Sequence, residues 1–151
     1  MHVDAELSFN TVAANVLTAQ AETTQAAHVS TNVIDTTAVP LNLNRPLYFV
    51  FQCEVVPISA GGGTLLIELG NSAAAAMSTD TVIWSSGIII NSVITAWVAQ
   101  TTIYVVPVQG PFALRYVGVT YTIGTAVLTA GSWRAFLTPD APAIIPDEFA
   151  G

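Results

Sequence analysis

Apolar and polar residues alternate along much of the chain, which is the period expected of a β-strand whose two faces meet different surroundings. The clearest alternation covers residues 47–56 and is bracketed by Pro46 and Pro57. Its more apolar face carries Phe51 and Cys53, and apolar side chains on such a face are usually buried. The pattern therefore predicts a strand with these two side chains in the core.

Further strand-like runs follow, separated by Gly and Pro. Alternation and β-branched content predict strands at 64–69, 81–84, 88–90, 102–106, 114–123 and 132–138. Residues 73–77 are predicted to form a loop or a single helical turn. Many short strands with no long helical pattern predict an all-β fold, which could be a sandwich, a jelly roll or a barrel.

The first 30 residues differ from the rest, because they are rich in Ala, Thr, Gln and Asn and nearly free of aromatics. Their apolar positions have helical spacing, but the many Thr and Asn residues fit an extended arm at least as well. These positions are Phe9, Val12, Ala13, Val16 and Leu17. They are too few to form their own core, so the arm is expected to order against a neighbour. The predicted organisation is an N-terminal arm at 1–30, a β-domain at 31–138 and a C-terminal tail at 139–151.

Composition narrows the function classes. The chain has 151 residues, of which 52% are hydrophobic and 9% charged. No uninterrupted apolar run reaches the roughly 18 residues of a membrane helix. There is no lysine and the net charge is −7, so we expect neither nucleic-acid nor membrane binding. The acidic start does not resemble a secretory signal, and a single cysteine fits a reducing compartment.

Candidate catalytic chemistry is sparse. The only histidines, His2 and His28, lie in the arm, far along the chain from Cys53. This set provides neither the spacing of a metal site nor a recognisable nucleophile with its base, so no cofactor is expected. Glu54 and Glu68 would form a glycosidase pair only if they met across a cleft, and solvated acids on strand faces are the simpler interpretation.

Two scarce residue types have alternative roles. The tryptophans could form a sugar-binding platform, although large core or interface residues are the simpler interpretation. They are Trp84, Trp97 and Trp133. The arginines are expected to pair with carboxylates, within the subunit or across an interface, with the internal pairing favoured. They are Arg45, Arg115 and Arg134.

Several short motifs follow one another along most of the chain. They are Ser30–Asp35, Pro46–Gln52, Thr64–Leu69, Leu114–Tyr116, Tyr121–Thr125, Thr129–Ser132, Ala135–Leu137 and Pro146–Phe149. In this order they resemble the capsid cement (decoration) proteins of tailed bacteriophages. The resemblance implies a jelly-roll-like β-sandwich without enzymatic activity. It also implies attachment to the outer surface of an icosahedral shell, beside the major capsid protein.

The expectation is therefore a structural virion protein, made in the host cytoplasm, that cements major capsid protein subunits and forms a homodimer or homotrimer. The alternatives are a glycan- or receptor-binding module of a virion and a small β-sandwich hydrolase. Subunit contacts have charge-depleted centres, which fits the low charge of the chain. The candidate interface residues are Phe9, Val12, Val16, Leu17, Arg45, Trp97 and Phe149.

Overall fold

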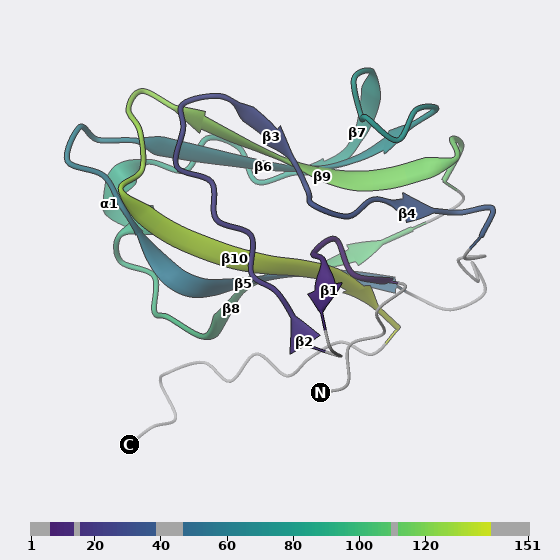
Figure 1. The fold of residues 1–151 in the computed structure, drawn as a ribbon, viewed down its shortest axis with the longest axis horizontal. Helices are drawn as coiled ribbons and strands as arrows, with labels where there is room; N and C mark the ends of the chain where they lie inside the picture. The colour runs from purple at the N-terminus through teal and green to yellow at the C-terminus, as the bar shows by residue number, and fades with distance from the viewer. Residues whose placement is uncertain (1–6, 14–15, 39–46, 110–111, 140–151) are drawn as a thin grey trace.

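Two antiparallel sheets face each other in the computed structural model, which describes residues 7–13, 16–38, 47–109 and 112–139 (Figure 1). One sheet has the order β10-β5-β8, with β5 at Leu47–Ile58, β8 at Thr101–Val108 and β10 at Ala130–Thr138. The other has the order β3-β9-β6-β7, and β4 also pairs with β9. Its strands are β3 (Ala27–Val29), β4 (Ile34–Asp35), β6 (Thr64–Ser72), β7 (Asp80–Ser85) and β9 (Tyr116–Gly124). The predicted all-β sandwich is confirmed.

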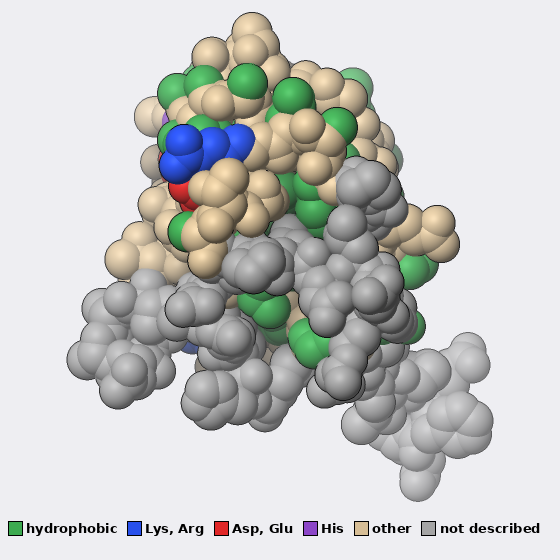
Figure 2. Space-filling view, turned by 90° about the vertical axis from the view of Figure 1, so that its right-hand side faces the viewer, with side chains coloured by type: hydrophobic (Ala, Val, Ile, Leu, Met, Phe, Trp, Pro, Cys, Tyr) green, Lys and Arg blue, Asp and Glu red, His purple; other side chains and the backbone are tan. Residues whose placement is uncertain are grey.

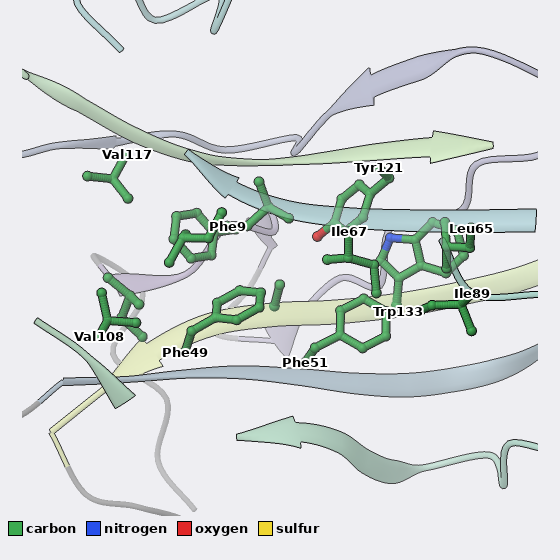
Figure 3. Close-up of a cluster of buried hydrophobic side chains, with 14 of the residues drawn as sticks. Phe9, Phe49, Phe51, Leu65, Ile67, Ile89, Val108, Val117, Tyr121 and Trp133 are labelled. Atoms are coloured by element: carbon green, nitrogen blue, oxygen red, sulfur yellow. The ribbon is translucent and has the colours of Figure 1, made fainter. Parts of the chain in front are cut away.

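The core lies between the sheets and follows the alternation in the sequence. Phe51 and Cys53 of β5 are buried as predicted, and Gln52 between them is only partly buried. Tyr121 of β9 and Trp133 of β10 are fully buried, with ring centroids 5.2 Å apart. Figure 3 shows these aromatic rings filling the space between the two sheets. Aromatic burial of this kind contributes much of the stability of a small sandwich.

One expected strand is wrong. Residues 88–90 make only an isolated bridge, between Ile89 and Leu65 of β6, and the chain then enters the short helix α1 at Asn91–Ile94. A four-residue helix is too short to show helical periodicity, and isolated helices of this length are not stable. Burial of Ile94 in the core holds it in place.

The N-terminal segment is extended and packs on its own sandwich. Strands β1 (Val12–Ala13) and β2 (Val16–Leu17) pair antiparallel, so the extended alternative holds and the helical one does not. Ser8 and Gln20 bridge to β10, and β3 is a strand of the larger sheet. Phe9 is fully buried, with its ring centroid 6.1 Å from that of Phe49. Its assignment to an interface between subunits is therefore corrected, because the ring has no surface left for a partner.

Candidate functional site

One end of the sandwich exposes a group of large aliphatic side chains, which we call the apolar end. Between 46% and 73% of the surface of each of these residues is exposed. They are Val55, Ile58, Ile88, Ile90, Val93, Val98 and Val127. Exposed aliphatic side chains carried by segments that meet at one end of a domain are a candidate interaction surface. The apolar end is therefore the main candidate for a functional surface.

Three segments that are distant in sequence come together there: the last part of β5, the stretch 86–100 between β7 and β8, and the loop between β9 and β10 (Figure 1). The Ile89–Leu65 bridge places residues 88–90 beside the start of β6, and α1 packs on β5 and β6. The Ser59 hydroxyl donates a 2.8 Å hydrogen bond to the carbonyl of Val127. The positive φ of Gly62, +75°, allows the nearby turn between β5 and β6.

The segments that meet at the apolar end lack charge. Residues 55–67, 81–114 and 116–133 contain no Asp, Glu, Lys or Arg. Natural proteins commonly use charged side chains to keep exposed edges from associating. Here such residues are missing from a bare aliphatic surface, on a chain that otherwise carries ten acids. The surface therefore favours contact with another apolar surface.

The opposite end carries an ion pair between Asp35 of β4 and Arg115, which immediately precedes β9. Arg115 donates hydrogen bonds to Asp35, from Nε to Oδ1 at 3.0 Å and from Nη2 to Oδ2 at 2.6 Å. Hydrogen bonds from Arg115 and then from Thr37 lower the pKa of Asp35 well below its usual range. The guanidinium also lies over the ring of Tyr116. Figure 2 views this end, where Lys or Arg atoms stand out above Asp or Glu atoms.

A second arginine is paired in the same way. Arg134 of β10 lies 3.2 Å from the carboxylate of Glu54 on the neighbouring strand β5. The favoured prediction, pairing within the subunit, is therefore confirmed for Arg115 and Arg134. Arg45 lies outside the described residues.

A small pocket opens at the same end as the Arg115–Asp35 ion pair, between β7 and the segment that follows β8. Its volume is about 200 Å³, and Ile83, Phe112 and Leu114 provide apolar parts of its lining. The Asn71 side chain donates hydrogen bonds to the carbonyls of Leu114 and Tyr116 and so holds one wall in place. No charged residue lines it among those described. It has room for one apolar side chain of a partner.

The two carboxylates considered as a catalytic pair do not meet. Glu54 alternates with the inward-facing Cys53 on β5, and Glu68 alternates with the inward-facing Leu69 on β6. The two strands belong to opposite sheets, so the two glutamates project from the two outer faces of the sandwich. The geometry does not support a glycosidase pair at these positions.

Cys53 and the three tryptophans lie in the hydrophobic core or pack against it. Burial raises the pKa of Cys53 to about 11, so the thiol stays protonated and unreactive at neutral pH. Trp133 is fully buried, and Trp84 and Trp97 pack against Phe49 and Phe51. The three rings therefore form no exposed platform for a sugar. Within the described part of the chain, no three His, Cys, Asp or Glu side chains gather as metal ligands.

The other candidate interface residues are placed as follows. Val12, Val16 and Leu17 lie in β1 and β2, and Trp97 is partly buried on Phe51, immediately before Val98 of the apolar end. Phe149 lies outside the described residues. Sequence reasoning missed the apolar end itself. The signal that could have found it is the charge-free stretch 81–114, which contains the run Ile88–Ile90.

Comparisons with known proteins give one family. The family model described as Bbp16 matches residues 16–137, which is most of the chain and includes every strand from β2 to β9 and nearly all of β10. No curated protein matches the sequence. Among the described residues, no helix is long and apolar enough to cross a lipid bilayer.

Proposed function

The chain belongs to the Bbp16 family, and from this premise we propose that it is a capsid cement protein of a tailed bacteriophage. In this role it binds the outer surface of the shell and stabilises contacts between neighbouring major capsid protein subunits. It is a structural protein of the virion, made in the host cytoplasm, and it carries out no catalysis. The order of motifs that resembles cement proteins supports the proposal.

The observation that carries the proposal is the apolar end. A chain that worked alone in solution would gain nothing from seven exposed aliphatic side chains, and it would be prone to aggregate through them. A subunit of an assembly covers such a surface, because the buried centres of subunit contacts are apolar and depleted in charge. The surface therefore supports a role in which the chain ends in contact with other proteins.

The charge of the chain supports a location on the outer face of the shell. The chain has ten acids, three arginines and no lysine. Proteins that contact packaged nucleic acid neutralise phosphates with Lys and Arg, and this chain lacks the means to do so. A net charge of −7 suits a surface that is turned away from DNA and towards solvent.

The mechanism is mass action on the assembled state. A protein that binds only the expanded shell stabilises that shell by RT ln(1 + [L]/Kd) per site, about 2.7 kcal/mol when the free protein exceeds Kd by 100-fold. The sites repeat over the whole lattice, so the contributions add. Together they oppose the outward pressure of packaged DNA.

The test is co-sedimentation of the full chain with empty, expanded shells of the major capsid protein. Unexpanded shells of the same protein provide the matched control. We expect saturable pelleting with expanded shells, little with unexpanded ones, and a higher disruption temperature for the decorated shells. If the chain stays in the supernatant with both kinds of shell, the proposal is wrong.

The glycan- or receptor-binding alternative has no observation in its favour. It depended on tryptophans clustered on an exposed face, and Trp133 is fully buried. The cement function is therefore the one proposed.

A further inference from the structure

We propose that the free edge of β7 accepts an extended segment of the major capsid protein, which adds to the larger sheet as a further strand. The inference rests on the proposed function and deepens it by naming the surface that meets the capsid protein and the kind of segment it takes. That segment has an apolar side chain on one face, which enters the pocket beside β7, and basic side chains on the other face.

Strand β7 ends the larger sheet and pairs only with β6 among the described residues. Leu65 and Ile89 exchange both of their backbone hydrogen bonds, so odd-numbered residues of β6 direct their N–H and C=O groups to this side. Gly70, which lies opposite Val82, belongs to the alternate set and directs its groups to β9. The N–H and C=O of Val82 therefore point away from β6, where they can bind the backbone of another strand.

The other sheet edges are less open to a new strand. Ser8 and Gln20 of the N-terminal segment bridge to β10, and β8 contains Pro107, a residue that commonly protects an edge. At the far side of the larger sheet, β3 and β4 have only three and two residues. Strand β7 offers six residues without Pro or Lys.

The inner face of β7 borders the pocket. Thr81 and Ile83 line it together with Asn71 of β6, which is paired with Thr81 and shares its face. Every second side chain of an added strand would lie on this same face. The pocket has a volume of about 200 Å³, and none of the described residues that line it is charged. A charged side chain would lose its hydration there without a partner, so the pocket fits an apolar one.

The outer face of the same edge carries two carboxylates without a cation. Asp80 of β7 lies on this face with its side chain against Gly70, and Glu68 of the neighbouring β6 lies on it as well. Neither forms an ion pair within the described part of the chain, because both described arginines bind other carboxylates. Lys or Arg on the outer face of an added strand would supply the missing charge.

This charge pattern favours the capsid protein over a second copy of the chain. The chain has no lysine, and its C-terminal residues 140–151 contain three acids and no basic residue. Strand β7 of a second copy would also leave the pocket empty, because its side chains on that face, Thr81 and Ile83, line a pocket of their own. The basic side chains must therefore come from another protein, and the proposed function supplies one.

Hydrogen exchange of the full chain, free and bound to empty, expanded shells, tests strand addition directly. Mass spectrometry of the digested protein follows the β7 segment. Its amides should exchange about tenfold more slowly or less on the shell, because the added strand pairs with the free edge. Strand β3, at the other edge of the same sheet, is the internal control and should keep its exchange rate.

Val82→Pro and Val82→Ala form a matched pair. Both replace the Val82 side chain, but only proline removes the N–H, which takes no part in the pairing with β6. Val82→Pro should bind expanded shells about tenfold more weakly than Val82→Ala, because a carbonyl of the added strand loses its donor. Asp80→Asn should weaken binding about threefold and reduce its dependence on salt. Circular dichroism monitors the folding of each variant.

The outcomes separate this inference from the proposed function. Shells that bind the wild type but leave exchange in β7 unchanged, or that bind Val82→Pro as tightly as Val82→Ala, overturn the inference and leave the cement function standing. Protection of β7 that rises with the concentration of the free chain would place a second copy on the edge and overturn it too. If Val82→Pro does not fold, exchange in the wild type decides. A wild type that does not pellet overturns both proposals.

Discussion

The interior of the sandwich and its apolar end are both built from hydrophobic residues. Those of the interior are covered by other parts of the chain, and those of the apolar end are exposed to solvent. Strand β5 contributes to both: Phe51 is fully buried, and Val55, four residues later, is 48% exposed. In the interior, aromatic rings from both sheets pack against one another. At the apolar end, aliphatic side chains from three segments are exposed to solvent.

The difference shows that the hydrophobic content of the chain has two separate uses. Folding of one chain accounts for the interior, where Phe9, Phe51 and Trp133 lose all contact with water. It does not account for the apolar end, where substitution should hardly affect folding. The predictions below test this separation, starting with the largest expected effect.

Deleting residues 1–29 should abolish folding. The deletion removes Phe9, whose loss alone is expected to destabilise by about 3–5 kcal/mol, together with β3 and the bridges to β10. Small domains have a total stability of only about 5–15 kcal/mol. Circular dichroism and thermal melting of the shortened chain check this. A folded, cooperatively melting product would show that the segment is an accessory arm and not part of the sandwich.

Phe51→Ala should reduce the free energy of unfolding by about 3–5 kcal/mol, because it empties the centre of the aromatic cluster. The matched control is Gln52→Ala on the outer face, which should cost no more than about 1 kcal/mol for its hydrogen bond to Thr102. Urea unfolding of the three proteins provides the measurement. Similar losses at both positions would contradict the assignment of the faces of β5.

Asp35→Asn should lower stability slightly at neutral pH, and the difference should shrink as the pH falls. The pKa of Asp35 is lowered chiefly by the hydrogen bonds from Arg115, so the ion pair stabilises the fold above the ordinary carboxyl pKa of about 4. Below that pH the unfolded chain takes up the proton first and the contribution fades. Urea midpoints of both proteins from pH 7 down to pH 2 test this, and a difference that does not depend on pH would contradict it.

Ile88→Ser should leave the free energy of unfolding of the monomer within about 0.5 kcal/mol of its original value, since the side chain is largely outside the packed core. The measurement is urea unfolding at a concentration low enough to keep the chain monomeric. A loss comparable to that of Phe51→Ala would show that the apolar end belongs to the core of the single chain.

Much of the fold could be predicted from the sequence, because successive side chains of a strand point to opposite faces. Where one face is buried, apolar and polar residues therefore alternate. The faces of β5, β6 and β9 follow this alternation, and every expected strand except 88–90 is present. The N-terminal segment could not be placed, because its bridges to β10 join residues more than 100 positions apart, and the ring of Phe9 packs on Phe49 of β5. Local spacing carries no information about such pairings.

The candidate surface was harder to predict for a different reason. Individually, Ile58, Ile88 and Val127 look like core residues, and an apolar residue in a strand-rich chain is more often buried than exposed. Only the folded chain shows that they are exposed and that the segments carrying them meet at one end of the sandwich (Figure 1). The pairing of the arginines was easier to predict, because a chain with ten acids and only three arginines offers each arginine many carboxylates.

The most direct test of the account is a pair of binding isotherms, for the wild-type chain and for Ile88→Glu, on the same empty, expanded shells. The account predicts saturable binding of the wild type and binding of Ile88→Glu that is weaker by about 100-fold, because assembly would bury an unpaired carboxylate in an apolar contact. Identical isotherms would contradict it, because the apolar end would then make no contact in the decorated shell.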